Sequence, residues 1–200
     1  MRENNEVRYF VLPRGSPLFH GSEQATGYDA CVRAIVSTDF DGSLKCQRKD
    51  LYGFGKPEGG LENRVVWEDG RYVYLLQPGE AVNIGLGIVL GMKPSWTAMM
   101  TRRSSTGLAD MDLLSEPGMP EWIKDVMGNI FIDSDFRGEP IARLLNLGRK
   151  EFPIWHGRRL VQIAFLNGKG VRHPTLTPVR SISELGSTIR GNGCHGSSGK

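Results

Sequence analysis

Four short segments of the chain combine glycine with charged or hydroxyl side chains, residue types that can bind ligands or take part in catalysis. In chain order they are ATGYDA (25–30), TRRSSTG (101–107), FIDSDFRGE (131–139) and RGNGCHGSSG (190–199). Glycine lets backbone N–H groups approach an anion closely, while arginine and serine add guanidinium and hydroxyl donors. The second and fourth segments, which contain arginine and serine, suit the binding of phosphate groups.

The second segment places two cations directly before two hydroxyls. Arg102 and Arg103 precede Ser104 and Ser105, so guanidinium, hydroxyl and backbone donors occur together, as phosphate oxygens require. A strand end with solvated arginines has the same composition. Taken alone, the segment therefore leaves both interpretations open.

The C-terminal segment repeats this pattern. Arg190 is followed by glycines and by the hydroxyls of Ser197 and Ser198. Backbone N–H groups of such a glycine-rich stretch can surround an anion. A mobile polar terminus has the same composition, so a second observation is needed to separate the two interpretations.

The third segment carries two carboxylates two positions apart, Asp133 and Asp135, after an apolar pair. On a continued strand both would face the same side, but Gly138 predicts a turn nearby. An aspartate at a strand end can form a turn, bind a metal ion or act as a general base. The residues alone do not choose among these roles.

In this order, the segments resemble the motifs of the homotrimeric dUTPase (dUTP diphosphatase) family, in the dUTPase and dCTP deaminase superfamily. ATGYDA is similar to the first family motif, AMMTRRSS (98–105) to the second and IDSDFRGE (132–139) to the third. GRRLVQIAF (157–165) is similar to the fourth motif and RGNGCHGSSG to the glycine-rich fifth. Any one motif would be unspecific, but five in order are specific.

The resemblance implies an enzyme that hydrolyses dUTP to dUMP and pyrophosphate, with Mg²⁺ carried by the nucleotide phosphates and each site shared among the subunits of a homotrimer. Asp133 is then the general base that activates water for attack on the α-phosphorus. Asp29 matches a carboxylate of the metal region, in indirect contact through water. The substrate-binding positions that match are Arg103, Ser104, Ser105, Gln162, Arg190, Ser197 and Ser198.

Two positions depart from the family pattern around the base and sugar, and the register of a third is shifted. Phe136 stands where the family usually has a tyrosine that packs against deoxyribose. His195 replaces the tail phenylalanine that stacks on the base, and an imidazole can also stack while adding a pH-dependent charge. Asn129 is the candidate for the asparagine that recognises uracil, although an insertion at 108–127 shifts its register. Uracil specificity therefore depends on the part of the motif set that departs most from the family pattern.

The elements that must position these residues show a period of two rather than 3.6. From Val82 to Leu90, apolar residues alternate with mostly Asn and Gly, which predicts a half-buried strand. Asp69-Gly70 inside RVVWEDGRYVYLL predicts a tight hairpin over 64–76. Further strands are predicted at 7–12, 32–36, 97–102, 140–146 and 160–165.

Helix signals are sparse, and the best is PEWIKDVM at 120–127, which begins with proline and precedes a glycine. Short strands between Gly and Pro turns predict a sandwich or barrel. With the resemblance, this becomes an all-β, dUTPase-like β-barrel (a distorted jelly roll) with one short helix. One domain is expected over 1–185, with insertions at about 37–74 and 108–127, followed by a flexible phosphate-binding tail at 186–200.

Composition and charge argue against several other classes of protein. The 200 residues carry a net charge of +3 and no run of five or six like charges, so direct nucleic-acid binding is not expected. The 3 cysteines are widely spaced, which argues against a disulfide framework and a zinc site. Without a signal-peptide pattern or an apolar run long enough to span a bilayer, we expect a cytoplasmic protein with no membrane partner.

Alternatives from other classes remain. A dCTP deaminase would need a glutamate on the strand after the third motif, where this chain has Arg143, and arginine cannot perform that proton transfer. A pyrophosphatase for another or modified deoxynucleotide fits the altered base pocket. A dUTPase-like regulatory protein could bind a protein partner through its insertions, with Trp67 and Trp122 as candidate anchors.

Overall fold

The computed structural model describes residues 5–22, 25–39, 47–108, 111–114 and 130–192. These residues form mostly short strands, and one α-helix, α1 (Ser104–Leu108), and one 3₁₀ helix, η1 (Ile182–Leu185), occur within the described ranges. The predicted all-β class is therefore confirmed. No helix within these ranges is long and apolar enough to cross a membrane.

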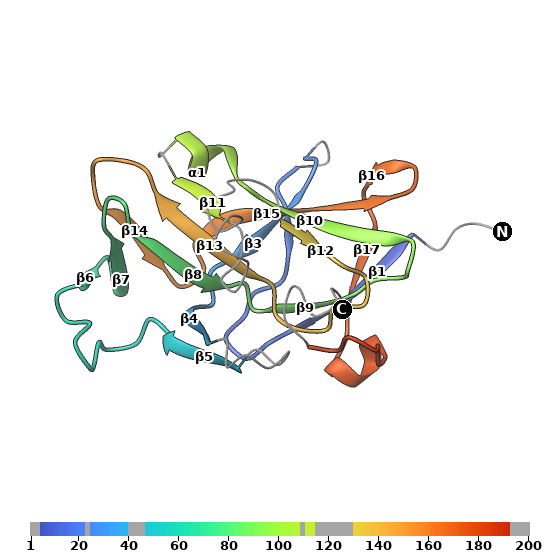
Figure 1. Ribbon diagram of the computed structural model, residues 1–200, viewed down its shortest axis with the longest axis horizontal. Helices are drawn as coiled ribbons and strands as arrows, with labels where there is room; N and C mark the ends of the chain where they lie inside the picture. The colour runs from blue at the N-terminus through green and yellow to red at the C-terminus, as the bar shows by residue number, and fades with distance from the viewer. Residues whose placement is uncertain (1–4, 23–24, 40–46, 109–110, 115–129, 193–200) are drawn as a thin grey trace.

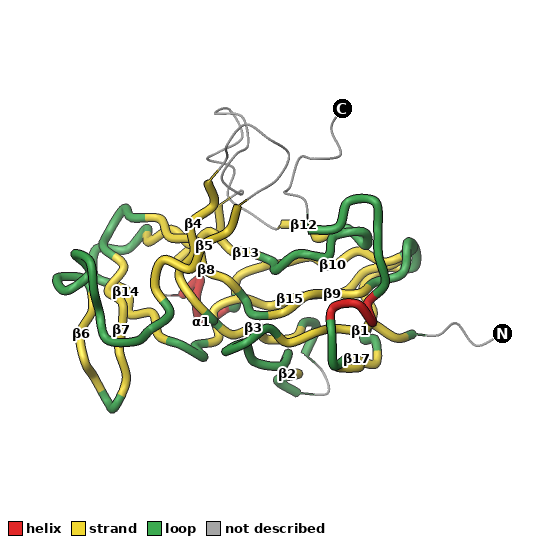
Figure 2. Tube along the Cα trace, turned by 90° about the horizontal axis from the view of Figure 1, so that it is seen from below, coloured by secondary structure: helices red, strands yellow, loops and turns green. Residues whose placement is uncertain are grey.

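The larger of two main sheets carries most of the motif residues. Its central strands are β10 (Trp96–Arg102), β15 (Arg159–Asn167) and β3 (Tyr28–Cys31), which run side by side through the middle of the molecule (Figure 2). The three-residue β12 (Ile130–Ile132) lies on one edge, and β2 (Phe19–His20) lies on the other. β16 (Gly170–Arg172) pairs with the C-terminal end of β15.

The second main sheet has five strands. In spatial order they are β11 (Met111–Leu114), β13 (Ile141–Asn146), β8 (Ala81–Gly85), β4 (Ala34–Asp39) and β5 (Gln47–Tyr52). The insertion predicted from about residue 37 includes paired strands, because β4 and β5 form a hairpin that extends this sheet. The segment 37–60 shows no sustained alternation of apolar and polar residues, so the pairing of its strands is not visible in a hydrophobic pattern.

Two three-stranded sheets lie at opposite ends of the molecule (Figures 1 and 2). One consists of β14 (Phe152–Trp155), β7 (Arg71–Leu76) and β6 (Val65–Glu68). The predicted 64–76 hairpin is confirmed: Asp69 and Gly70 have φ values of 48° and 75°, as its tight turn requires. The other consists of β17 (Thr175–Pro178), β1 (Glu6–Val11) and β9 (Ile88–Gly91).

The predicted strand from Val82 to Leu90 is wrong as a single element. It is interrupted between β8 and β9, which belong to different sheets. Gly87 lies at the interruption with a φ of 68°, and its carbonyl accepts a hydrogen bond of 2.9 Å from Leu12. A Cβ at Gly87 would lie 2.6 Å from the Cα of Gly15. Glycine is therefore required there, and it lets the chain change sheets.

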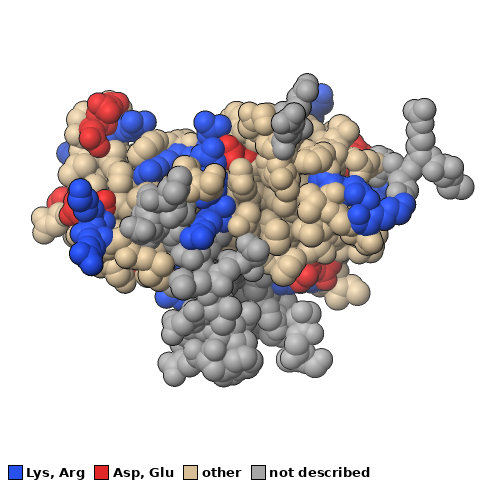
Figure 3. All heavy atoms as spheres, turned by 90° about the horizontal axis from the view of Figure 1, so that it is seen from above, with Lys and Arg blue, Asp and Glu red and all other residues tan. Residues whose placement is uncertain are grey.

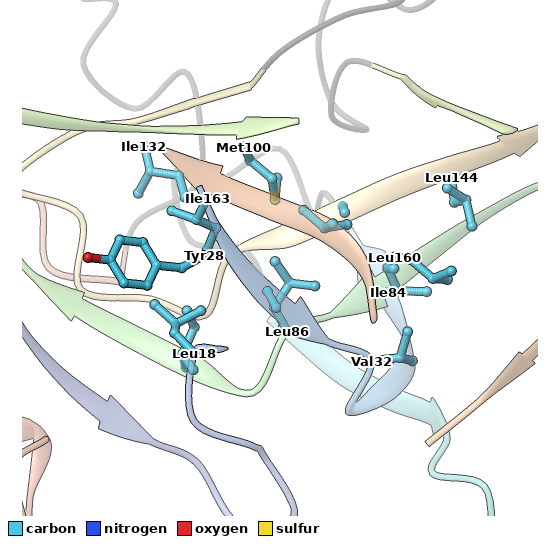
Figure 4. Packing of buried hydrophobic residues seen from close by; sticks show 14 of the residues in the cluster. Leu18, Tyr28, Val32, Ile84, Leu86, Met100, Ile132, Leu144, Leu160 and Ile163 are labelled. Atoms are coloured by element: carbon cyan, nitrogen blue, oxygen red, sulfur yellow. The ribbon is translucent and has the colours of Figure 1, made fainter. Parts of the chain in front are cut away.

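One hydrophobic cluster joins the two main sheets (Figure 4). Met100, Ile132 and Ile163 enter it from the larger sheet, and Ile84 and Leu144 enter it from the five-stranded sheet. All five side chains are fully buried. Burial of such side chains is the main favourable contribution to folding, and here it fixes how the two sheets face each other.

A buried ion-pair network reinforces this junction. Glu139, in the third motif, accepts two hydrogen bonds of 2.8 Å from the Arg33 guanidinium and one of 2.7 Å from the Gly87 backbone N–H. Arg33 also donates to both carboxylate oxygens of Asp50, at 2.6 and 2.7 Å. These bonds hold β4, β5 and the loop before β13 together.

Candidate active site

The first cluster of predicted site residues forms around Asp29 on β3. Its side chain is 2% exposed, and such burial of a carboxylate is unfavourable unless cations or donors surround it. The Nε atom of Arg103 lies 2.8 Å from Oδ1, and the Nη1 atom of Arg159 lies 3.3 Å from Oδ2. Gln162 donates from Nε2 to Oδ1 at 3.3 Å. The first, second and fourth motifs therefore meet at one buried carboxylate.

A β-bulge makes this convergence possible. In the β15–β3 pairing, Gln162 lies opposite Asp29, but the register shifts between Arg159 and Val161. Residues three apart on a regular strand would point to opposite faces, whereas the extra residue turns Arg159 and Gln162 to the same face. The sequence motif shows that Arg159 and Gln162 are present, and the bulge determines that both side chains point toward Asp29.

A concave surface opens beside this cluster. It has a volume of about 340 Å³, and its lining includes Arg103, Ser105, Arg158 and Arg159. Ser104 and Ser105 are exposed at the beginning of α1. Figure 3 shows Lys and Arg side chains gathered on the face of the molecule on which Figure 1 places α1. This surface is concave and basic, as an anion site requires.

The second cluster forms where the third motif leaves β12. Asp133 begins a turn closed by a 3.1 Å hydrogen bond from the Phe136 N–H to the Asp133 carbonyl. The Asp133 side chain is 56% exposed and pairs with the guanidinium of Arg190, whose Nη1 also lies 3.7 Å from Asp135. The carboxylate is therefore both accessible and held beside a cation from the fifth motif.

The segment that contains Arg190 is anchored to the third motif. Thr188 donates its hydroxyl to the Asp135 carbonyl at 2.5 Å, and the Arg137 N–H donates to the Gly191 carbonyl at 2.6 Å. The ring of Phe136 is 1% exposed, and the Arg190 guanidinium lies 5.4 Å from its centroid. In this arrangement the Phe136 ring is not accessible to a sugar.

The two clusters lie at opposite ends of β10. Ile132 pairs with Ala98 near the beginning of this strand, which places Asp133 at that end, whereas Arg103 directly follows its last residue. β10 has seven residues, and at a rise of about 3.3 Å per residue it spans roughly 20 Å. One chain therefore does not bring Asp133 and Arg103 to the same point.

Sequence reasoning missed three contributors to these clusters. Arg158 and Arg159 are visible as a pair, but their directions depend on the bulge. Thr106 is buried and donates its hydroxyl to the Leu160 carbonyl at 2.9 Å, which fixes α1 against β15. The helix expected at 120–127 and four predicted site residues lie outside the described residues: Asn129, His195, Ser197 and Ser198.

Arg143 lies on β13, opposite Asn83 of β8 and Leu114 of β11. It lines a concave surface of about 450 Å³ together with Tyr52, Tyr74 and Glu80. The Tyr74 hydroxyl donates to Glu80 at 2.9 Å, and burial, followed by this hydrogen bond, raises the pKa of Tyr74 to about 12. Arg143 lies on the strand after the third motif, where the deaminase alternative requires a glutamate.

The described residues do not provide a metal cage. They contain no group of three or more His, Cys, Asp and Glu side chains placed to hold a metal ion. Both oxygens of Asp29 already face Arg103, Arg159 or the Gln162 amide. This donor set does not fit direct coordination of a divalent cation by Asp29.

Comparison with curated proteins reveals relatives of one kind. The chain is 31% identical to a deoxyuridine 5′-triphosphate nucleotidohydrolase of Mesorhizobium japonicum over 143 residues, which cover 70% of this chain and 76% of that protein. It is 29% identical to a protein of the same name from Rhizobium rhizogenes over 145 residues, 72% of this chain and 81% of the other. No model of a protein family matches the chain.

Solved structures support the fold. A dUTPase of bacteriophage 80alpha matches with a TM-score of 0.52 and 13% identity, over 99% of this chain and 100% of that one. A variant of the Staphylococcus bacteriophage 80alpha dUTPase solved with dUpNHpp matches with a TM-score of 0.51 and 10% identity, over 88% of this chain and 96% of the other. The dUTPase-like jelly-roll fold predicted from the motifs is thus confirmed. Together with the identity to the Mesorhizobium protein, this shows that the chain belongs to the dUTPase family.

Proposed function

We propose that this protein is a dUTP diphosphatase, which hydrolyses dUTP to dUMP and pyrophosphate. Its curated relatives carry the name of that activity. The observation that carries the proposal within the molecule is the exposed carboxylate of Asp133, at a turn and beside the guanidinium of Arg190. A base must be accessible to water, and the developing charge on a phosphate needs a nearby cation.

In the proposed reaction, Asp133 accepts a proton from a water molecule as the water oxygen attacks the α-phosphorus. A bond forms between that oxygen and the α-phosphorus, and the bond from the α-phosphorus to the oxygen that bridges it to the β-phosphorus breaks. Pyrophosphate leaves with the electron pair of that bond. The leaving group carries increasing negative charge, which arginines can stabilise in a water-poor site.

The triphosphate is proposed to lie on the basic surface beside Asp29. Arg103 and Ser105 line that surface, and Gln162 lies next to Arg103 on the Asp29 carboxylate. Asp29 is then a positioning residue that fixes the directions of these donors. Ser104 is exposed at the same helix terminus and can add a hydroxyl donor.

A complete site requires more than one copy of the chain. Asp133 and Arg103 lie at opposite ends of β10, and the three phosphates of one nucleotide are too short to connect them. A closed ring of identical subunits would bring the Asp133 end of one copy to the Arg103 end of the next. This supports the homotrimer with shared sites that the motifs imply.

Mg²⁺ is proposed to arrive with the nucleotide, bound by phosphate oxygens, and to neutralise part of the triphosphate charge. A variant of the phage phi11 dUTPase, with a related fold, coordinates a structural Mg(II) ion in its solved structure. In this chain, any contact from Asp29 would be indirect, through water, because its oxygens already face arginines and the Gln162 amide.

The remaining candidate residues are proposed to act on the base, the sugar and the terminal phosphate. Phe136 would pack against deoxyribose once Arg190 moves onto the substrate, and Asn129 would recognise uracil. His195, Ser197 and Ser198 would close over the nucleotide with Arg190. The departures at Phe136 and His195 leave a modified deoxyuridine triphosphate as the second candidate substrate.

A substrate panel tests the proposed function. Purified protein with Mg²⁺ is incubated with dUTP, dCTP, dTTP, UTP and a modified deoxyuridine triphosphate, and the products are separated. Release of pyrophosphate from dUTP is expected. Cleavage of another deoxynucleotide alone would change the substrate and keep the mechanism, whereas deamination of dCTP would favour the deaminase alternative. If no nucleotide reacts, the regulatory binding protein becomes the better hypothesis.

A further inference from the structure

Arg158, just before β15, is a cation for which the described chain provides no acidic partner. Its guanidinium lies 4.1 Å from the ring centroid of Phe152 and 4.4 Å from that of Trp155. Its Nη1 atom is buried and makes no hydrogen bond to the described residues. The two rings fix the guanidinium in place but do not neutralise its charge.

The neighbouring arginines differ in this respect. Arg103 and Arg159 line the same concave surface, and both face the Asp29 carboxylate, at 2.8 and 3.3 Å. Part of their charge is therefore compensated before any ligand binds. Arg158 is the arginine of this surface that faces no carboxylate of the described residues.

A second guanidinium increases the local positive charge. Arg71, on the β6–β7 hairpin, also lies 4.4 Å from the centroid of Trp155. Burial, followed by the like charge of Arg71, lowers the pKa of Arg158 to about 10. Arg158 is still charged at neutral pH, and an anion on this surface would offset the unfavourable effect of the like charge of Arg71.

The concave surface has the size and chemistry for such an anion. It measures about 340 Å³, and Ser105 adds a hydroxyl donor beside the three arginines. Arginine forks match phosphate oxygens in geometry as well as in charge. A group with several negative charges, such as a polyphosphate, would therefore interact with Arg158 more strongly than a monophosphate does.

We propose that Arg158 binds the β- or γ-phosphate of the substrate and thereby selects the nucleoside triphosphate over the monophosphate product. This rests on the proposed function, since it assumes that the triphosphate lies on this surface. The Phe152 and Trp155 rings act as positioning residues that hold the guanidinium. The hairpin β6–β7 participates through Arg71, which gives this part of the 37–74 insertion a role at the site.

The test measures selectivity, defined as the dissociation constant of dUMP divided by that of the non-hydrolysable analogue dUpNHpp. Calorimetric titrations with Mg²⁺ compare the wild type with Arg158→Met and Arg158→Lys. Loss of a charge-assisted contact should lower selectivity about 10- to 100-fold in Arg158→Met, through weaker dUpNHpp binding, with dUMP binding within about twofold of wild type. Arg158→Lys keeps the positive charge but lacks the two parallel N–H donors of the guanidinium, so its selectivity should be several-fold lower than that of the wild type.

Arg172→Met is the matched control. Arg172 lies on β16, opposite Phe165. This position is about 20 Å along β15 from Arg159. The selectivity of Arg172→Met should equal that of the wild type. A partly unfolded variant lowers the number of binding sites but does not change a ratio of dissociation constants, so the measurement remains decisive.

Unchanged selectivity in both Arg158 variants would overturn the proposal, as would an equal loss of dUMP and dUpNHpp binding, which a purely structural role predicts. Failure of the proposed function gives a different result. In that case the wild type would not bind dUpNHpp, while inorganic triphosphate would still bind and would still depend on Arg158.

Discussion

The guanidinium of Arg190 pairs with the carboxylate of Asp133, although 57 positions separate the two residues in the chain. Arg190 comes from the glycine-rich fifth motif and Asp133 from the third. Hydrogen bonds from Thr188 and to Gly191 hold the backbone around this pair. The proposed base therefore faces the cation that the substrate phosphates would attract.

Truncation after Ile189 should reduce kcat/KM for dUTP by about 100-fold or more. The shortened chain lacks Arg190, and removal of a group that stabilises transition-state charge typically has an effect of this size. Steady-state pyrophosphate release measures it, with a chain ending at Gly199 as the control. Equal activity of the two truncated chains would show that Arg190 and the tail do not take part in turnover.

Glu139→Gln should lower the free energy of unfolding by about 2 kcal/mol, because the Arg33 guanidinium and the Gly87 N–H lose their charged acceptor and Arg33 keeps only the half-exposed Asp50 as a counter-charge. Both side chains are largely buried, at 9% and 11% exposure. Urea unfolding monitored by tryptophan fluorescence gives the value. The exposed pair Arg71–Asp69 provides the comparison, since Asp69→Asn should change stability by less than about 1 kcal/mol. Similar effects at the two positions would contradict the assignment of Glu139 to a buried network.

Asp50 makes a pH-dependent contribution to stability. Its hydrogen bonds from Arg33 hold the pKa of the carboxyl below its ordinary value of 3.8. A lowered pKa in the folded state stabilises the protein above the unfolded-state pKa, and this stabilisation is lost as the pH falls through the folded-state pKa. The wild type should therefore exceed Asp50→Asn in urea midpoint at pH 6, and the difference should shrink below about pH 3.8. If the difference in urea midpoint grew as the pH fell, the Asp50 carboxylate would not stabilise the folded state in the way described.

Gly87→Ala should destabilise the protein by about 3 kcal/mol, because it combines an unfavourable positive φ with a backbone clash against Gly15. Gly59→Ala is the matched control. Gly59 has a similar φ of 69°, but a Cβ there would meet no atom within 4 Å. The control should cost only about 1 kcal/mol. If the two variants lowered the thermal unfolding temperature equally, the backbone at Gly15 would have moved away from the new methyl group without loss of stability.

Much of the fold was predictable because its signals are local. Alternating apolar residues marked most of the strands, and Asp69-Gly70 specified its hairpin turn. The order of the motifs then indicated the family. The features that were missed are non-local: the break at Gly87 depends on contact with Gly15, and the β4–β5 hairpin depends on pairing between largely polar strands.

The site was predictable in its residue types but not in its geometry. The fourth motif identified Gln162. Only the bulge after Arg159 shows why the side chains of Arg159 and Gln162 both reach Asp29. The pairing of Arg190 with Asp133 depends on how the chain end packs against the third motif. The separation of Asp133 from Arg103 along β10 required the strand register, and the proposed site shared between subunits rests on it.

The most direct test of the central claim is the turnover of dUTP by Asp133→Asn. The asparagine keeps the size and the turn-forming ability of the residue but cannot accept a proton from water at neutral pH. Pyrophosphate release should fall by about 1,000-fold or more, while dUpNHpp binds with wild-type affinity. Full activity of Asp133→Asn with dUTP would contradict the assignment of Asp133 as the base, and with it the proposed mechanism.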